Sequence, residues 1–315
     1  MQLNIISYDD LVGSNNVIAI QSLEDALFQK GIVGIRDVPQ FASKTRQFIE
    51  SARLFSKLPE TIKQHYAPDW DAGETEGYEL GAEWFKNQQG VWQIDDKKAS
   101  FYANVPDHSH NKWPAEMDLR TPYLELGGLI FSVGKLLLDL IGLNDAMGLQ
   151  HKHLKGYGRL LHYHKGNDVN NADMDWCGAH FDHGVFTGLI PAYYFQEDKE
   201  IDEPSDAGLY IVPTNGHNFE KILVPDKSTL LFQVGEFGQL ISNDKIMATK
   251  HTVKKAQGAI ERFTFALFYS ADDNTVIRSC SRLIKDTRYS ENQFSDGSIN
   301  YGKWQDASFA RYRAK

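Results

Sequence analysis

The sequence predicts a mainly β fold with N-terminal helices. Apolar residues recur at helical spacing before residue 155, whereas short runs of β-branched, aromatic and aliphatic residues separated by turns dominate after it. Several short strands in succession are typical of a β-sandwich or barrel. No Pro- or Ser-rich linker divides the chain. We therefore expect residues 1–154 to buttress a β core formed by residues 155–315, and not to fold independently.

The N-terminal region shows helical patterns around one predicted strand. Ser22 is placed to cap a short helix that ends at Gly31, and the apolar run over 31–38 then predicts a strand. A second helix, ending before Pro59, is indicated by apolar residues at helical spacing: Phe48, Ala52 and Phe55. A longer helix is indicated by one apolar stripe, formed by Leu126, Ile130, Val133, Leu137 and Leu140.

The C-terminal region alternates short apolar runs with turns. Five of these runs are rich in residues that favour strands, and they cover 157–164, 208–213, 229–235, 250–253 and 262–269. The last segment, Tyr301 to Tyr312, predicts a helix that closes the chain. The core should therefore consist of short strands followed by one C-terminal helix.

The composition disfavours several classes of partner. The net charge is -9, which argues against nucleic acid or an anionic membrane, since both require a basic face. The most apolar stretch, Leu124 to Leu143, contains charged residues and so favours a core helix over a membrane span. Two cysteines and an N-terminus without a secretory signal fit a reducing compartment. We expect a cytoplasmic protein, monomeric or weakly oligomeric, that acts on a small molecule.

His180 and Asp182 are the first candidate metal ligands. Residues i and i+2 of a strand point to the same face, so the segment GAHFDHG aims one imidazole and one carboxylate together. A second imidazole would complete a 2-His-1-carboxylate triad, which leaves coordination positions open and suits non-haem iron(II). Among the eleven histidines of the chain, this is the only His-x-Asp sequence.

Paired histidines offer alternative metal sites, because two imidazoles also bind zinc. There are three His-x-His pairs: His108/His110, His151/His153 and His162/His164. The first two lie in polar sequence without a suitable third ligand nearby, which favours surface or structural roles. His183, one residue beyond Asp182, is expected to face the other side of its strand and not to bind the metal.

A family resemblance begins at His180. The segment HFDHGVFTGL resembles the His-x-Asp-x-Gly-x-x-Thr signature of the isopenicillin N synthase-like 2-oxoglutarate/iron(II) dioxygenases, with Gly184 and Thr187 in the matching places. It continues through the N-terminal segments ALFQKGIVGIRDVP and FSKLPETIKQHY and the C-terminal NYGKWQDASFARYR. The resemblance therefore covers essentially the whole chain.

Further matches lie in the C-terminal half. His251 resembles the family's distal histidine, and Arg262 with Thr264 resembles its Arg-x-Ser, with Thr in place of Ser. Tyr163 matches a tyrosine that commonly touches the cosubstrate, whereas Leu161 stands where the family often has Asn. A guanidinium fork and a hydroxyl on one strand face suit a carboxylate. The resemblance implies that Arg262, Thr264 and Tyr163 bind 2-oxoglutarate.

The resemblance also implies an architecture and a reaction. The core would be a double-stranded β-helix, or jelly roll, that binds Fe(II) through His180, Asp182 and His251. The cosubstrates would be 2-oxoglutarate and O2, and the default reaction is hydroxylation of a small molecule with release of succinate and CO2. Loops that enclose the substrate are expected at 77–87, at 193–205 and in the tail near Phe294.

Arg159 is a candidate substrate-binding residue. It alternates with Leu161 and Tyr163, so all three should face the same cavity. A buried guanidinium requires an anion, because it stays charged at any working pH. That anion is either a carboxylate of the substrate or an acidic side chain of the protein.

Two other functions remain open from the sequence. Relatives with the same triad include oxidases and cyclases that do not use 2-oxoglutarate, although Tyr163 favours 2-oxoglutarate. A non-catalytic jelly-roll binding protein is an alternative of another class, and the intact triad disfavours it. A zinc hydrolase would need a neighbouring base that the motif does not supply.

Overall fold

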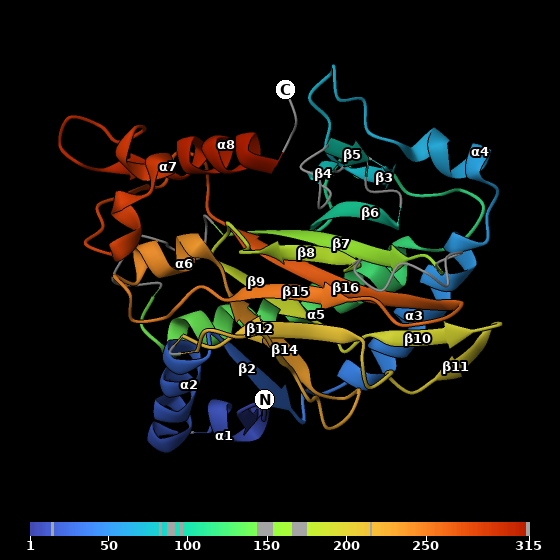
Figure 1. Cartoon of the computed structure of the whole chain (residues 1–315), viewed down its shortest axis with the longest axis horizontal. Coiled ribbons are helices and arrows are strands. Elements are labelled where there is room, and N and C mark those ends of the chain that lie inside the picture. Colours follow the sequence, from blue (N-terminus) through green and yellow to red (C-terminus); the bar gives the residue numbers. More distant parts are fainter. Residues whose placement is uncertain are drawn as a thin grey trace.

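Two β-sheets form the centre of the structure (Figure 1). Residues of both sheets line one cavity. This computed structural model describes residues 1–13, 16–81, 84–86, 92–94, 97–143, 154–165, 175–214 and 216–312, with the backbone alone for 84–86 and 92–94. The mainly β fold with N-terminal helices that the sequence predicts is confirmed.

The larger sheet contains ten strands within the described residues. Its main path runs through β1 (Ile5–Ser7), β2 (Ile32–Arg36), β14 (Leu230–Val234), β9 (Phe186–Leu189), β16 (Ile260–Ser270), β7 (Lys155–Tyr163), β6 (Lys98–Val105) and β3 (Gly77–Leu80). Off this path, β16 also pairs with β10 (Tyr193–Gln196), which pairs with β11 (Lys199–Ile201). Strands β1 and β2 are parallel, and β16 pairs antiparallel with each of its neighbours.

The smaller sheet has four strands within the described residues. Their order is β13 (Glu220–Lys221), β12 (Gly208–Val212), β15 (Lys250–Lys254) and β8 (Cys177–His180). Two further short antiparallel pairs occur within the described residues, β4 (Trp84–Lys86) with β5 (Trp92–Ile94), and β17 (Val276–Ile277) with β18 (Ile299–Asn300).

Helices surround the sheets. In chain order they are α1 (Tyr8–Val12), α2 (Val17–Gln29), α3 (Phe41–Ser56), α4 (Glu60–Lys63), α5 (Arg120–Leu140), α6 (Glu236–Ile241), α7 (Thr287–Ser290) and α8 (Tyr301–Tyr312), with 3-10 turns η1 (Gln64–Tyr66) and η3 (Arg282–Lys285). None of the helices in the described ranges is long and apolar enough to cross a membrane.

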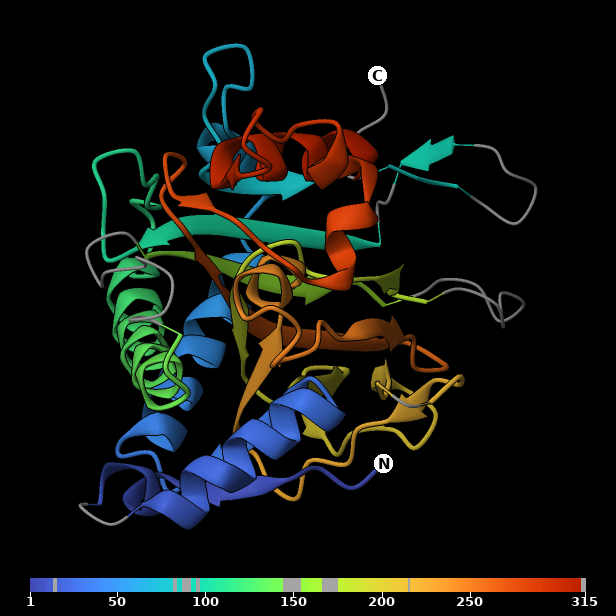
Figure 2. The same cartoon turned by 90° about the vertical axis from the view of Figure 1, so that its left-hand side faces the viewer.

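Helices α3 and α5 cover the outer face of the larger sheet (Figure 2). The ring of Phe48 on α3 makes edge contacts with Tyr123 on α5, at 5.8 Å, and with Phe265 on β16, at 4.9 Å. All three side chains are almost completely buried, and burial of one such apolar side chain stabilises the fold by about 1.5–3 kcal/mol. A Cβ at Gly134 would lie 2.1 Å from Tyr269 Oη, so α5 approaches the sheet this closely only with glycine there.

Strand β16 separates this helical layer from the cavity. Its residues Phe263, Phe265, Leu267 and Tyr269 belong to the core beneath the helices. The alternate residues line the cavity instead, namely Arg262, Thr264, Ala266 and Phe268. This two-residue periodicity follows from strand geometry, and it places one face of the strand at the site.

Several predicted elements differ in their extent. Helix α2 begins at Val17, and Ser22 lies inside it with its hydroxyl bonded to the Ile18 carbonyl one turn earlier. Ser22 is therefore not a helix cap. The segment expected as a loop at 193–205 contains β10 and β11, because β16 is long enough to pair with β10 beyond its pairing with β9.

The N-terminal region also contributes strands to the larger sheet. Strand β6 pairs along its length with β7, and β2 pairs with β14. Strands from before residue 155 thus bond directly to strands from after it. The division of the chain into a region 1–154 and a core 155–315 stays a prediction.

Candidate metal centre and cavity

A cavity of about 300 Å³ lies between the two sheets. Its lining includes every site residue that the sequence predicts: Arg159, Tyr163, His180, Asp182, His251, Arg262 and Thr264. These residues come from β7, β8, the segment after β8, β15 and β16. The fold therefore brings together side chains that lie up to about a hundred positions apart in the chain.

Three of these side chains converge on one point. The potential ligand atoms of His180, Asp182 and His251 all lie within 4.8 Å of one another, and no other such group occurs among the described residues. Asp182 Oδ1 lies 3.7 Å from His180 Nε2 and 3.9 Å from His251 Nε2. These separations suit three ligands arranged around a single small cation.

The two histidines are brought together by pairing of β8 with β15. His180 is the last residue of β8, and its backbone partner is His251 on β15. Asp182 lies beyond the end of β8, so the expectation that it shares a strand face with His180 is wrong. The chain turns after His180, and this turn, rather than strand alternation, directs the carboxylate toward the imidazoles.

Backbone carbonyls orient both imidazoles. His180 Nδ1 lies 2.8 Å from the Gly178 carbonyl oxygen, and His251 Nδ1 lies 3.0 Å from that of Thr249. A proton on Nδ1 donated to a carbonyl leaves the lone pair of Nε2 free on the opposite side of the ring. Both free nitrogens then face Asp182.

The carboxylate is held as well. Thr187 Oγ1 donates a 2.7 Å hydrogen bond to Asp182 Oδ2, which leaves Oδ1 as the oxygen nearest to the histidines. Gly184, between these two residues, packs so closely that a Cβ would lie 2.8 Å from the Tyr269 carbonyl oxygen. The spacing of Asp182, Gly184 and Thr187 in the motif thus has a direct structural reason.

The three side chains of the cluster differ in their protonation at neutral pH. Burial lowers the pKa of His251, and the nearby His180 lowers it further, to about 4. Burial alone would lower the pKa of His180, but Cys177 and Asp182 raise it to about 9. Burial opposes ionisation of Asp182, yet the charges of His251 and His180 keep its pKa below the usual value. At neutral pH His251 is therefore a neutral imidazole and Asp182 an ionised carboxylate, whereas His180 is protonated and must release a proton when it binds a metal.

Arg262 is a buried cation with an unused donor. Its Nε lies 3.4 Å from Tyr194 Oη, and Tyr194 in turn donates to Glu203. The guanidinium lies over the ring of Tyr163 at 4.9 Å. Nη1 is buried, and nothing in the described part of the chain accepts a hydrogen bond from it. A guanidinium in this state fits a carboxylate from outside the protein.

Thr264 and Tyr163 lie beside Arg262 in the cavity wall. The Thr264 hydroxyl donates its proton to the Ile190 carbonyl at 3.0 Å, so it must rotate before it can donate to a ligand. Burial, followed by the effect of Cys177, raises the pKa of Tyr163, so its phenol stays protonated as a donor. Leu161, on the same face, adds an apolar side chain to the lining.

Arg159 faces the cavity as its alternation with Leu161 and Tyr163 predicts. Its Nε donates to Ser100 Oγ at 2.9 Å, and its guanidinium lies 5.0 Å from the centre of the Tyr102 ring. The Tyr102 ring stacks on Tyr157 at 5.5 Å. The guanidinium is therefore held against a stack of two aromatic rings at the edge of the cavity.

The alternative metal sites do not gain support. His108 and His110 have rings 4.7 Å apart, and those of His162 and His164 are 4.5 Å apart. His162 Nε2 also lies 3.3 Å from Glu261 Oε1, but neither pair belongs to a group of three ligand atoms within reach of one cation among the described residues. The pair His151/His153 lies outside the described residues. The ring of His183 packs against Phe309 at 4.7 Å and is not part of the cluster.

Gln233 is a site residue that sequence reasoning missed. It is completely buried on β14, where it pairs with Thr187 of β9. Its side-chain amide lies 2.8 Å from His251 Nδ1 and 3.4 Å from Asp182 Oδ2. The signal was available, because a lone amide within the apolar run LLFQV is expensive to bury without polar partners.

Comparisons with known proteins find distant relatives. No protein-family model matches the chain. Among curated proteins, 1-aminocyclopropane-1-carboxylate oxidase homolog 10 of Arabidopsis thaliana is 22% identical over 98% of this chain and 78% of its own length. Homolog 3 of the same plant is 29% identical over 47% of this chain and 37% of its own length.

Solved structures match over nearly the whole chain. A full-length protein of Neurospora crassa in complex with alpha-KG has a TM-score of 0.73 at 18% identity, covering 98% of this chain and 96% of that one. A putative 2OG-Fe(II) oxygenase family protein from Caulobacter crescentus has a TM-score of 0.74 at 19% identity, covering 98% of both chains. The predicted resemblance to the isopenicillin N synthase-like dioxygenases is thereby confirmed, and the chain has the jelly-roll fold of the 2-oxoglutarate/iron(II) oxygenases.

Proposed function

We propose that this protein is an Fe(II)- and 2-oxoglutarate-dependent dioxygenase that hydroxylates a small molecule with release of succinate and CO2. The observation that carries the proposal is the buried cluster of His180, Asp182 and His251 in the same cavity as the unused donor of Arg262. The donor set fits the metal, because two imidazoles and one carboxylate leave coordination positions open for a cosubstrate and O2.

Similar solved structures support the proposed cofactors. The full-length Neurospora crassa protein was solved with alpha-KG, and JOX2 was solved with 2OG, Fe and JA. The Neurospora crassa protein was also solved with alpha-KG and thymine together, which supports a small organic molecule as the substrate of this chain. The metal ligands would be His180, Asp182 and His251, and the 2-oxoglutarate ligands would be Arg262, Thr264 and Tyr163.

Each proposed residue has a physical task. Bound Fe(II) supplies the activation of O2, while the protein binds, orients and excludes water. Arg262 neutralises a carboxylate at the far end of 2-oxoglutarate, and the buried Tyr163 ring supports the guanidinium from one face. Apolar residues in the lining keep the cavity dry: Leu161, Leu189, Leu209 and Val253. None of these tasks requires a general base.

Arg159 gives the proposal a substrate class. Its guanidinium lines the cavity on the same strand face as Tyr163. We propose that it binds a carboxylate of the substrate, which makes a carboxylated small molecule the preferred class. Ser100 and Tyr102 hold the guanidinium in place before the substrate arrives.

The proposed activity is tested without knowledge of the substrate. Protein loaded with Fe(II) and given 2-oxoglutarate and O2 should release succinate slowly, and Asp182→Ala should abolish that release. His110→Ala, which removes an exposed histidine outside the cluster, serves as the control and should behave like wild type. O2 uptake without succinate would favour the oxidase alternative, and no metal binding would favour a non-catalytic binding protein.

A further inference from the structure

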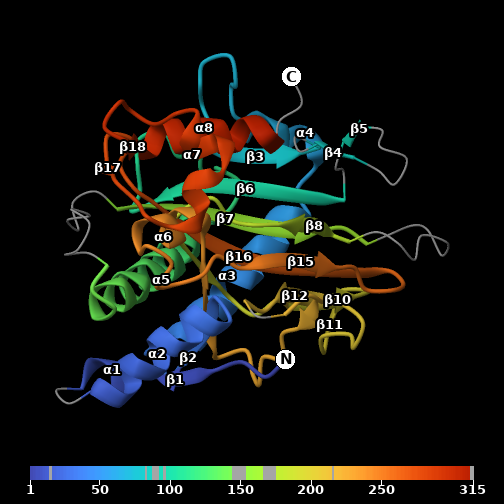
Figure 3. The same ribbon diagram turned by 60° about the vertical axis from the view of Figure 1, so that its left-hand side comes forward.

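The loop that carries Asp182 contacts the C-terminal part of the chain. This β8–β9 loop (residues 181–185) contacts the start of α6 (Glu236–Ile241). The C-terminal segment (residues 279–312) packs against α6 in turn (Figure 3). Neither α6 nor the C-terminal segment contributes a side chain to the cavity lining. They therefore contact the loop from outside the cavity and do not touch a molecule bound in it.

Helix α6 begins on the carbonyl groups of the β8–β9 loop. The Glu236 N–H donates to the Asp182 carbonyl at 2.7 Å, and the Phe237 N–H donates to the Gly184 carbonyl at 3.0 Å. The first N–H groups of a helix have no partner within the helix, so the loop acts as the cap of α6. A Cβ at Gly235 would lie 2.2 Å from the Gly184 carbonyl oxygen, which makes this close contact dependent on glycine.

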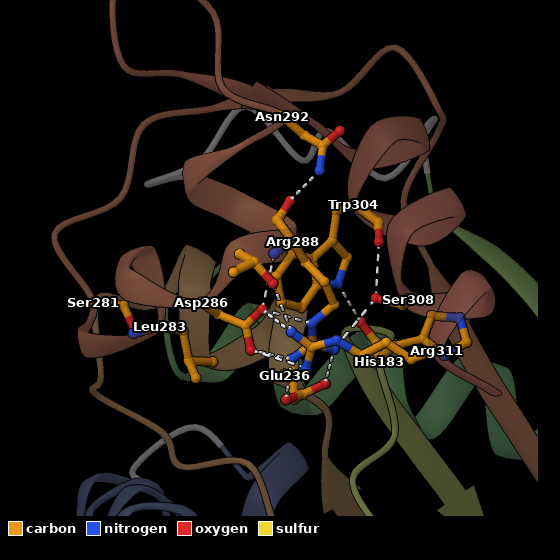
Figure 4. A network of polar contacts seen from close by, with 11 residues as sticks. His183, Glu236, Ser281, Leu283, Asp286, Arg288, Asn292, Trp304, Ser308 and Arg311 are labelled. Carbon is orange, nitrogen blue, oxygen red and sulfur yellow. Dashed lines mark hydrogen bonds and ion pairs between the residues drawn. The ribbon is translucent and has the colours of Figure 1, made fainter.

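Arg288 connects α6 to the C-terminal segment (Figure 4). Both of its terminal nitrogens bond to the Glu236 carboxylate, at 2.5 and 2.6 Å, and the pair is almost completely buried. The same guanidinium bonds to Asp286 and lies 4.2 Å from the centre of the Trp304 ring. Arg311 pairs with Asp286 from α8, so the two acidic side chains are matched by two guanidinium groups.

Helix α8 also contacts the loop directly. Trp304 Nε1 donates a 2.9 Å hydrogen bond to the His183 carbonyl (Figure 4). The Phe309 ring packs edge-on against the His183 ring at 4.7 Å. The residue that follows Asp182 is thus held by both its backbone and its side chain from the C-terminal helix.

We propose that Arg288 and Trp304 are positioning residues that fix the β8–β9 loop in the conformation in which Asp182 faces the two histidines. Arg288 acts through Glu236 and the start of α6, and Trp304 acts on the loop itself. Groups that orient metal ligands without touching the metal typically change metal affinity about 10–100-fold. Metal binding and docking of the C-terminal segment are then coupled, and the coupling is reciprocal. This inference rests on the proposed function, because it takes Asp182 as a metal ligand.

The first experiment measures Mn(II) binding by calorimetry, with Mn(II) replacing oxygen-sensitive Fe(II). Trp304→Phe removes the donor to His183 but keeps an aromatic ring, and it should bind Mn(II) about 10–100-fold more weakly. Arg288→Lys keeps the charge but loses the paired contact with Glu236, and it should act in the same direction. The control is Phe48→Leu, which disturbs buried rings on the far side of the larger sheet. It should lower the melting temperature and leave Mn(II) affinity unchanged.

The second experiment measures amide hydrogen exchange of α8 with and without Mn(II). Slower exchange over residues 301–312 on metal binding is expected in wild type, and a smaller effect is expected in Trp304→Phe. The positioning role would be overturned if both variants bound Mn(II) with wild-type affinity. It would also be overturned if the amide exchange rates of α8 were the same with and without Mn(II). Equal loss of affinity in Phe48→Leu would overturn it too, since general destabilisation would explain the effect. A wild-type protein that binds no Mn(II) would contradict the proposed function itself.

Discussion

Thr187 Oγ1 donates a 2.7 Å hydrogen bond to Asp182 Oδ2, and this contact decides which carboxylate oxygen faces the histidines. Both residues are buried. The Thr187 hydroxyl thus fixes Oδ2 of Asp182, and Oδ1 of Asp182 is directed toward the two histidines.

Replacing Thr187 by Val keeps the shape of the side chain and removes this donor. Metal affinity should fall about 10–100-fold, because Asp182 loses its shortest orienting hydrogen bond. The free energy of unfolding should fall by about 1–3 kcal/mol, because the buried Oδ2 of Asp182 keeps only the 3.4 Å contact with Gln233. Mn(II) calorimetry and urea denaturation measure the two effects. Thr187→Ser retains the hydroxyl and should stay near wild type, whereas tight Mn(II) binding by the Val variant would contradict the role of this contact.

Replacing Arg262 by Ala should weaken 2-oxoglutarate binding at least about tenfold, since loss of a buried charge-assisted contact costs about 2–5 kcal/mol. Mn(II) binding should remain nearly unchanged, because Arg262 is not part of the ligand cluster. Titration of 2-oxoglutarate into the Mn(II)-loaded protein measures the first effect. Arg278→Ala, which removes a largely exposed guanidinium, is the control. An unchanged 2-oxoglutarate affinity in Arg262→Ala would favour the oxidase alternative.

Replacing Arg159 by Met removes the charge and keeps much of the bulk. Carboxylated substrates should then no longer stimulate succinate release, whereas slow release without substrate should continue. The measurement is succinate formed in the presence of paired test compounds, each a carboxylic acid and its amide. Arg159→Lys should retain part of the preference for the acid. Equal stimulation by acid and amide in wild type would show that the substrate's charge is not read at this residue.

His164 predicts a pH dependence of stability. Burial, followed by the charges of His162 and Lys63, lowers its pKa from 6.5 to about 4, and its Nε2 is buried without a partner in the described residues. Between pH 6.5 and 4 the unfolded chain therefore binds more protons at His164 than the folded chain does. The free energy of unfolding consequently falls as the pH is lowered through that range. His164→Gln should flatten this loss by about 1 kcal/mol or more. Urea denaturation at pH 7 and pH 5 measures it, with exposed His217→Gln as the control. Identical pH profiles for wild type and His164→Gln would exclude His164 as the source.

Much of the site follows from patterns that are local in the sequence. Strand alternation correctly places Arg262 and Thr264 on one face of β16, and Arg159 and Tyr163 on one face of β7. The period of two is a property of the extended backbone itself, so it holds before any tertiary contact forms. His180 and Asp182 were chosen from the His-x-Asp sequence and His251 from the family resemblance, and the structure places their ligand atoms together.

Other features depend on contacts between distant segments. Gln233 reaches the cluster because β14 pairs with β9, and β10 exists as a strand because β16 extends far enough to pair with it. The Thr264 hydroxyl is bonded to Ile190, a partner that no local pattern indicates. In each case the partner is chosen by how the sheets assemble.

The sequence by itself determined the fold class and the faces of the central strands, because these depend on periodicity, and it indicated the candidate ligands through the His-x-Asp sequence and the family resemblance. Only the tertiary structure decided how those ligands are held. Asp182 is directed by a turn beyond β8, by Thr187 and by α6, whose first N–H group donates a hydrogen bond to the Asp182 carbonyl. Arg288 and Glu236 are 52 positions apart, and nothing in local spacing pairs two charges across that distance. The two charges pair because both are buried, and a buried charge is destabilising unless the fold places an opposite charge beside it.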